Sequence, residues 1–251
     1  MSKANITKGI GVAFIPEICY DNAEYIGKQT LKCTDGRGKE MLKEYATILD
    51  LGTDEIIEKK SRFIGYVCHA ETEEEAELFV SEIRKKHYDA RHNCYAYSVG
   101  IEQPVLRFSD DGEPGGTAGK PILEVITGNG LYNVCIVVTR YFGGTLLGTG
   151  GLVRAYTDAA RMCVKAAAIV KKRMVMPVTL TTNYTDLGKI QYILGNEGVL
   201  IKDSQYGEEV VLKVEIFVDD VERINKALTE ATAARILFEQ ESAVFSVYGG
   251  V

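Results

Sequence analysis

The sequence predicts an α+β protein of two domains, residues 41–170 and residues 171–251. A buried-strand pattern, Val134–Thr139, leads through a glycine-rich loop into a long helical pattern. Strand and helix patterns begin again after residue 171, in the order strand, helix, strand, strand, helix, strand. That order is the split βαβ plan of ferredoxin-like domains. Each part is long enough to bury a core of its own.

Residues 1–40 differ from the rest of the chain because they show no sustained helical or strand period. A clear pattern begins at Met41. We therefore expect residues 1–40 to be an upstream extension that adds nothing to the folded core.

The first domain begins with strand patterns and then alternates between strands and helices. Thr72 is placed to cap its first helix, with Glu75 as the capping-box partner. The expected elements are two strands within Tyr45–Ala70 that meet at Lys59–Ser61, a helix at Glu71–His87, a hairpin of Asn93–Val99 and Pro104–Phe108, a short helix at Pro121–Thr127, the strand Val134–Thr139, and a helix from Leu152 to about Val170.

The second domain follows Lys171–Arg173, which we interpret as a solvated linker rather than a nucleic-acid patch. Its expected elements are a strand at Met174–Thr182, a helix at Tyr184–Asn196, strands at Val199–Tyr206 and Glu209–Val218, a helix at Asp219–Ala233, and a final strand at Arg235–Tyr248.

Composition narrows the class of protein. Apolar residues make up 46% of the chain and charged residues 25%, as in globular proteins. No apolar run could span a bilayer and no secretory signal is visible, so we expect a cytoplasmic protein without membrane contact. The six cysteines show neither a CxxC pair nor metal-ligand spacing, which favours buried reduced thiols. The net charge of −6 means that any contact with nucleic acid must be local.

Two glycine-dense motifs lie between Phe108 and Tyr156: DDGEPGGTAGKP and RYFGGTLLGTGGLVRAY. Their length, order and spacing closely resemble the signature of the IMPACT family, and the chain resembles its bacterial two-domain type. The resemblance extends from residue 45 to about residue 248. It implies a β–α sandwich, like a domain of a small-subunit ribosomal protein, followed by a ferredoxin-like module similar to the last domain of elongation factor G.

The resemblance also implies a link to translation. Eukaryotic members that resemble the first domain regulate translation during amino-acid starvation, by competing for a partner that activates a kinase. We expect this chain to lack their accessory N-terminal domain and to carry the bacterial module instead, so the kinase-pathway role does not transfer directly.

The glycine loops do not match the common nucleotide-binding motifs. GGTLLG is not followed by the Lys-Ser/Thr pair of a Walker loop, and no GxGxxG follows the strand. Two interpretations stay open. The backbone amides near Gly148–Gly151 at a helix N-terminus form a site for an anion or phosphate, or the glycines only permit close packing between helix and strand.

Side chains beside the loops favour a recognition surface. Arg140 ends the central strand, and Tyr141 and Phe142 follow it. Aromatic residues and cations in such a setting bind single-stranded RNA. The bland alternative is that half of the cations face water independently. The candidate binding residues are Arg91, His92, Asp110, Asp111, Gly112, Glu113, Thr117, Gly119, Lys120, Arg140, Tyr141, Phe142, Gly143, Gly144, Gly148, Gly150, Gly151 and Arg154, with Arg107 at the margin.

The carboxylates of Asp110, Asp111 and Glu113 are expected to cap helix N–H groups rather than to hold a metal ion. No nucleophile, base and partner occur at a spacing typical of catalysis, although His92 is the best candidate for a general base. The sequence therefore names no catalytic residue, no metal and no cofactor.

The leading hypothesis is a non-enzymatic binding protein that contacts RNA or a ribosome-associated protein through the two glycine loops. The alternative is an enzyme acting on a phosphorylated or nucleotide-like small molecule, because a fold alone does not fix a function.

Overall fold

The computed structural model describes residues 32–34 and 40–248. Contacts divide the chain into two compact units, with the division between Lys172 and Arg173. We call the described residues up to Lys172 the sandwich unit and Arg173–Ser246 the C-terminal unit. Both combine helices with antiparallel sheets, so the α+β class of two domains is confirmed.

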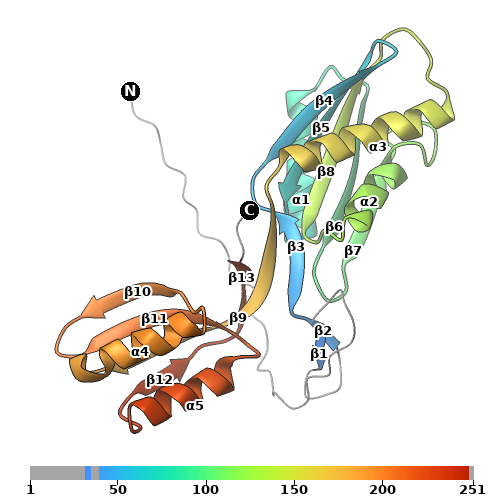
Figure 1. The fold of residues 1–251 in the computed structure, drawn as a ribbon. Helices are drawn as coiled ribbons and strands as arrows, with labels where there is room; N and C mark the ends of the chain where they lie inside the picture. Colours follow the sequence, from blue (N-terminus) through green and yellow to red (C-terminus); the bar gives the residue numbers. More distant parts are fainter. Residues whose placement is uncertain (1–31, 35–39, 249–251) are drawn as a thin grey trace, which may run out of the picture. The chain divides into compact units, whose positions relative to one another are not determined.

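The sandwich unit contains a five-stranded sheet in the order β4-β5-β8-β6-β7, antiparallel throughout. Helices α2 and α3 cover one face and α1 covers the other (Figure 1). Its elements are β3 (Glu44–Ile48), β4 (Gly52–Glu58), β5 (Ser61–His69), α1 (Glu73–Lys86), β6 (His92–Val99), β7 (Val105–Ser109), α2 (Gly119–Gly128), β8 (Val134–Tyr141) and α3 (Thr149–Ala166).

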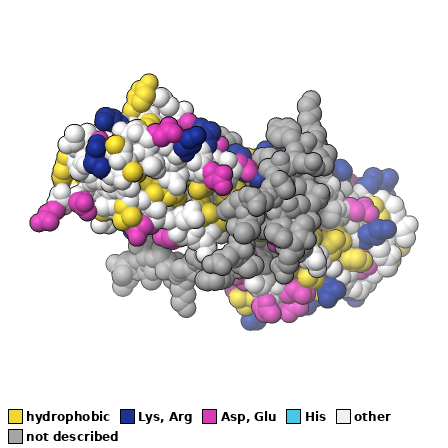
Figure 2. All heavy atoms as spheres, turned by 90° about the horizontal axis from the view of Figure 1, so that it is seen from below, with side chains coloured by type: hydrophobic (Ala, Val, Ile, Leu, Met, Phe, Trp, Pro, Cys, Tyr) yellow, Lys and Arg dark blue, Asp and Glu magenta, His cyan; other side chains and the backbone are white. Residues whose placement is uncertain are grey.

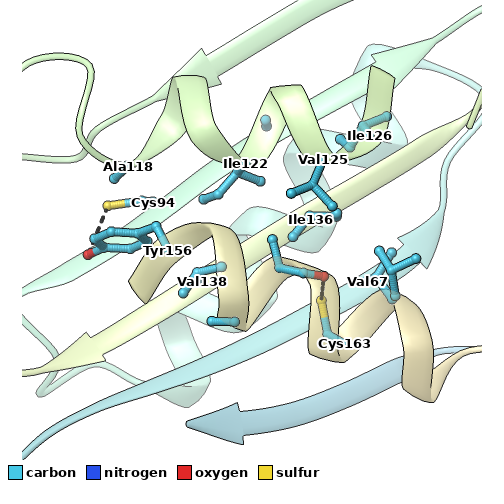
Figure 3. Packing of buried hydrophobic residues seen from close by; sticks show 14 of the residues in the cluster. Val67, Cys94, Ala118, Ile122, Val125, Ile126, Ile136, Val138, Tyr156 and Cys163 are labelled. Carbon is cyan, nitrogen blue, oxygen red and sulfur yellow. Dashed lines mark hydrogen bonds between the residues drawn. The ribbon is translucent and has the colours of Figure 1, made fainter. Parts of the chain in front are cut away.

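Residues alternate between two cores along each strand because successive side chains point to opposite faces of a sheet. Ile136 and Val138 of β8 pack under α2 and α3, together with Ile122 and Tyr156 (Figure 3). Cys135 and Val137 of the same strand pack under α1. The central strand is thus buried on both faces, which explains its continuous apolar pattern.

Helix α1 begins as the sequence predicts. The Thr72 hydroxyl accepts the Glu75 N–H at 3.2 Å, which confirms the N-cap. The Glu75 carboxylate accepts the N–H of Glu71, one residue before the cap. Ala76, Val80 and Ile83 form the buried stripe.

The C-terminal unit has the ferredoxin-like order of strands, β10-β11-β9-β12, with all three neighbouring pairs antiparallel. Strand β13 also pairs with β9. The Asp186 carboxylate is fully buried and receives two N–H groups of Arg235, at 2.9 and 3.0 Å. The elements are β9 (Ile169–Thr182), α4 (Tyr184–Asn196), β10 (Ile201–Tyr206), β11 (Val210–Phe217), α5 (Val221–Ala231), β12 (Leu237–Gln240) and β13 (Val244–Tyr248).

Four local expectations were wrong. The pattern from Tyr45 to the Lys59 turn forms two strands, β3 and β4, and the final strand also divides, into β12 and β13. The long helix ends at Ala166, and Lys171–Arg173 lies inside strand β9 instead of forming a linker. All three cations of that triplet contact carboxylates, those of Glu44, Glu71 and Asp219, which hold them in the strand.

The described residues before Met41 also contain regular secondary structure. Strand β1 (Lys32–Thr34) pairs with β2 (Glu40–Leu42), so regular structure begins before the expected start of the first domain. The rest of the expected extension lies outside the described residues. Within the described residues, no helix combines the length and the apolar character that a membrane crossing needs.

We expect Gly65→Ala to destabilise the sandwich unit, because a Cβ on this β5 residue would lie 2.6 Å from the Ala159 carbonyl oxygen of α3. Overpacking of this kind lowers the free energy of unfolding by about 1–3 kcal/mol. Gly128→Ala is the control, since a Cβ there meets nothing within 4 Å and its φ is not positive; its change should stay within about 0.5 kcal/mol. Urea unfolding followed by circular dichroism measures both. Equal midpoints for the two variants would contradict the close approach of sheet and helix.

Candidate functional site

Four connections meet at one end of the five-stranded sheet. The register places the β4–β5 turn, the start of β6, the end of β7 and the end of β8 at this end, with Glu58 opposite Ser61 and Arg62 opposite Tyr141. His92 lies opposite Arg140 there. The first glycine loop follows β7 and the second follows β8. We call this region the loop end of the sheet.

The first glycine loop folds around the carboxylate of Asp110. This carboxylate accepts the backbone N–H groups of Gly116, Ala118 and Gly119 at 2.8–3.0 Å. Gly119 is the first residue of α2, so the prediction that a loop carboxylate caps a helix is confirmed for Asp110. It is wrong for Asp111, which accepts the N–H of a β6 residue, and for Glu113, which pairs with Arg140. Partial burial raises the pKa of Asp110, but the three N–H donors outweigh it and the net shift is downward.

Asp111 fastens the first loop to β6. Its carboxylate accepts the Asn93 backbone N–H at 2.7 Å and the Arg84 guanidinium at 2.8 Å. The His92 ring contacts the Asp111 carbonyl oxygen through Nδ1 at 2.8 Å, and because a carbonyl only accepts, Nδ1 carries the proton. Gly112 follows with φ +86°, a conformation that favours glycine. His92 is therefore engaged in holding this loop.

Glu113 joins the first loop to the end of β8 through a buried ion pair. Arg140 Nη1 donates to Glu113 Oε1 at 2.6 Å, and the side chains are only 7% and 3% exposed. The Tyr156 hydroxyl of α3 donates to the same oxygen at 2.9 Å. Cys94 of β6 lies within 3.4 Å of that hydroxyl (Figure 3). Burial first, and then the neighbouring Cys94 and Glu113, raise the pKa of Tyr156 far above its usual range.

Arg140 is therefore buried rather than exposed as the sequence suggests. Its guanidinium carbon lies 5.4 Å from the centre of the Phe63 ring and 5.6 Å from that of Phe142. Its Nε is buried without a hydrogen-bond partner among the described residues. The residue Phe142 is 51% exposed, so Arg140 supports an aromatic side chain that is open to solvent.

The second loop packs on the β4–β5 turn at Gly143, and its Leu147 is buried in the core under α2 and α3. A Cβ on Gly143 would lie 2.0 Å from the Lys60 carbonyl, and the Gly143 N–H donates to Ser61 Oγ at 3.1 Å. Gly144 and Gly148 have φ of +82° and +76°. Gly148 is the N-cap residue of α3. Because glycine has no side chain, it cannot accept a hydrogen bond from the first backbone N–H groups of this helix.

The remaining candidate residues differ in their accessibility. Thr117 is buried and its hydroxyl donates to the Pro114 carbonyl at 2.6 Å. Gly150 is exposed, and a Cβ there would meet nothing within 4 Å. A Cβ on Gly151 would meet the Leu147 side chain at 3.0 Å. Because no atom lies near Gly150 on its outer side, the outer face of the first turn of α3 is accessible.

Tyr141 lies on the opposite face of the sheet from Arg140. Its hydroxyl donates to the Asp89 carboxylate at 2.9 Å and contacts His87 Nδ1 at 2.9 Å. His87 Nε2 contacts the Tyr66 hydroxyl at 2.8 Å. Burial and the nearby Lys86 lower the pKa of His87, which favours the neutral ring in this chain of hydrogen bonds. Tyr141 thus belongs to the α1 side and does not extend the Phe142 surface.

Three predicted cations at this end have no ion-pair partner within the described part of the chain: Arg91, Lys120 and Arg154, all exposed. Arg107 instead contacts Glu73 at 3.6 Å on the α1 side. The carboxylates of the first loop face inward and the free cations face outward, although the chain as a whole is acidic. The face shown in Figure 2, which is seen from below, has both signs of charge interspersed.

The sequence places Lys59 and Lys60 where two strands meet, but it does not predict them as residues of this site. Lys59 and Lys60 form the two-residue β4–β5 turn with φ of +44° and +67°. Such turns favour Asn-Gly, and each non-glycine residue in this conformation costs about 1 kcal/mol. The signal in the sequence is two consecutive lysines where a two-residue turn joins two strands.

The described residues contain no group of three or more His, Cys, Asp or Glu side chains that could hold a metal ion. The described cysteines are free thiols. Cys94, Cys135 and Cys163 are buried, as the sequence predicts, whereas Cys68 is only partly buried. Cys19 and the side chain of Cys33 lie outside the described residues.

Comparison with known proteins identifies the family. Residues 59–164 match the Impact N-terminal domain, which contains both glycine loops, and residues 180–235 match a domain of unknown function, DUF1949. The IMPACT family member YvyE of Bacillus subtilis is 38% identical over 192 residues, which cover 76% of this chain and 88% of that protein. The chain belongs to the IMPACT family.

Other relatives agree with this family. The IMPACT family member YigZ of Escherichia coli is 42% identical over 158 residues, covering 62% of this chain and 78% of that protein. A crystal structure of a hypothetical protein is 35% identical, with a TM-score of 0.53, and covers 79% of this chain and 97% of its own. Both similarities extend over more than three quarters of the length of the similar protein.

We expect Asp110→Ala to lower the free energy of unfolding by about 1–2 kcal/mol at pH 7, because the backbone N–H groups at the start of α2 lose their carboxylate acceptor. The pKa of Asp110 is held below its ordinary value, so its contribution is present above the pKa of the unfolded chain, about 4, and is lost as the pH falls below it. The difference between parent and variant should therefore shrink between about pH 5 and pH 3. Denaturant titrations at several pH values measure it.

The matched control is Asp158→Ala, which removes an exposed carboxylate that contacts Arg161 at 3.9 Å and caps no helix. Its effect should be within about 0.5 kcal/mol. A loss of stability in Asp110→Ala that is the same at pH 7 and pH 3 would show that the ionised carboxylate is not what holds the loop.

Proposed function

We propose that this IMPACT-family protein is a non-enzymatic binding protein that contacts RNA of the ribosome through the loop end of the sandwich unit. The observation that carries the proposal is the division of charge there. Carboxylates of the first loop are used internally, while Arg91, Lys120 and Arg154 have no ion-pair partner within the described residues. Such a role places the protein in the cytoplasm.

Electrostatics supports a local contact with phosphates. The phosphate backbone supplies most of the affinity in nucleic-acid binding, and it requires cations that are free to replace counterions. An arginine already paired with a carboxylate gains less from a phosphate, because it must first give up that pair. The free cations of the loop end can bind phosphates even though the net charge of the chain is −6.

The aromatic face at Phe142 supports RNA rather than another polyanion. Bases of single-stranded nucleic acid stack on exposed aromatic rings with little dependence on sequence. Phe142 is half exposed and lies over the Arg140 guanidinium, which is itself fixed by Glu113. A ring that is already held in place loses little freedom when a base stacks on it.

The N-terminus of α3 completes the proposed surface. Backbone N–H groups at a helix N-terminus favour anions, and Gly148 leaves them without a side-chain cap. Gly150 allows close approach because a Cβ there would meet nothing within 4 Å. Arg154 follows one turn later on the same helix and is exposed. A phosphate at this helix start would therefore meet both main-chain donors and a guanidinium.

Ribosome co-sedimentation tests the proposal. We expect the protein to sediment with ribosomes at low salt and less so at moderate salt, because phosphate contacts are screened. Arg154→Glu should reduce the sedimented fraction several-fold, since it replaces a free cation by an anion beside the helix start. Arg161→Glu is the control, because it lies two turns along the same helix and Arg161 is already paired with Asp158.

Equal sedimentation of the two variants would argue against the loop end as the contact surface. Absence of the unaltered protein from ribosomal fractions at both salt concentrations would contradict ribosome binding itself.

The alternative is an enzyme for a phosphorylated or nucleotide-like small molecule, and the uncapped start of α3 is the observation that favours it. A ligand that binds only the folded chain raises its melting temperature. If the alternative holds, one compound in a panel of nucleotides and sugar phosphates with Mg²⁺ should raise the melting temperature of the parent but not of Arg154→Glu. If our proposal holds, no compound in the panel should shift either protein.

A further inference from the structure

The turn between β4 and β5 contains two residues that are poorly suited to its geometry. Both Lys59 and Lys60 have positive φ, where glycine and asparagine are preferred. Lysine side chains gain nothing from this conformation. Strained residues of this kind persist where the surrounding structure fixes them, and they concentrate at sites of function.

The two lysines are also free to bind. Both are exposed, and neither forms an ion pair or a hydrogen bond through its ammonium group with any residue that the structure describes. The next cation along the chain, Arg62, is by contrast held by Glu55. The turn therefore presents two uncompensated positive charges side by side.

The position of the turn is fixed relative to the second glycine loop. The Lys60 carbonyl occupies the space that a Cβ on Gly143 would need, and Ser61 Oγ accepts the Gly143 N–H. Gly143 follows Phe142 directly in sequence. The backbone contact thus holds the two ammonium-bearing residues beside the loop that carries the exposed aromatic ring.

We infer that Lys59 and Lys60 are a phosphate-contacting element of a single-stranded RNA site whose base-stacking surface is Phe142. The inference rests on the proposed function and adds to it two residues and a binding mode. The turn contacts successive phosphates while a neighbouring base stacks on the ring. Cations that track the backbone beside an aromatic face are the usual means of holding single strands.

The test separates charge from turn geometry. The double variant Lys59→Asn/Lys60→Gly removes both charges and installs the residues that this turn prefers. Its melting temperature should stay equal or rise. Its affinity for fluorescein-labelled oligouridylate, measured by fluorescence anisotropy, should fall about tenfold or more at low salt. The slope of log affinity against log salt should decrease by roughly 1.4, because about 0.7 is expected for each phosphate contact of a single strand.

Two controls accompany it. Lys59→Arg/Lys60→Arg keeps both charges and the poorly suited turn, and should keep the affinity. Lys165→Asn/Lys213→Asn removes two exposed lysines, one in the last turn of α3 and one in β11, and should leave affinity and slope unchanged.

The outcomes are distinguishable. Failure of the unaltered protein to bind oligouridylate or ribosomes would overturn the proposed function and this inference together. Binding by the unaltered protein with parental affinity and slope in Lys59→Asn/Lys60→Gly would overturn this inference alone. Displacement of oligouridylate by polyglutamate as readily as by unlabelled oligouridylate, with no loss of affinity in Phe142→Ala, would indicate an acidic protein segment and would overturn the assignment to RNA.

Discussion

The buried pair of Glu113 and Arg140 is the constraint on which the loop end depends. Charges taken out of water are costly, and a pair is retained only when its geometry and hydrogen bonds compensate. Here the carboxylate receives both the guanidinium and the Tyr156 hydroxyl. Removing one member of such a pair leaves the other charge unpaired, at a cost of about 3–5 kcal/mol. The pair therefore fixes which conformation the two loops share.

This arrangement separates the residues that build the site from those that meet a partner. Asp110, Asp111 and Glu113 use their carboxylates to fold the first loop, and Arg140 uses its charge to support a ring. What faces solvent is then an aromatic face, main-chain donors and free cations. A surface made in this way is organised before any ligand arrives, which reduces the entropy lost on binding.

Local signals made much of the fold predictable. Helix α4 has the predicted bounds because Asn183 caps it, with its side chain accepting the Asp186 N–H. The central strand and the helix cap formed by Asp110 are likewise encoded by nearby residues. The errors occur where distant pairing decides. Lys171–Arg173 reads as a linker until Glu44, Glu71 and Asp219 are seen to pair with it.

The same limit applies to the site. A terminal strand arginine beside aromatic residues predicts an exposed cation, and only the carboxylate 27 residues earlier makes Arg140 internal. The sequence predicts a turn at Lys59–Ser61 but not its place in the site, because its neighbour, Gly143, lies about eighty residues further on. Tyr141 leaves the Phe142 surface simply because side chains alternate along a strand.

The rates at which the buried thiols of the sandwich unit react with an alkylating reagent report how its layers open. Burial raises the pKa of Cys163 to about 12, and it also places those of Cys94 and Cys135 above the ordinary range, so thiolate is scarce in the native state. A thiol reagent can reach these sulfurs only when the sheet and its covering helices part. Cys94 lies beneath the first loop, where it donates to the Asp110 carbonyl, whereas Cys135 lies under α1. The order in which they are alkylated therefore reports which layer opens first.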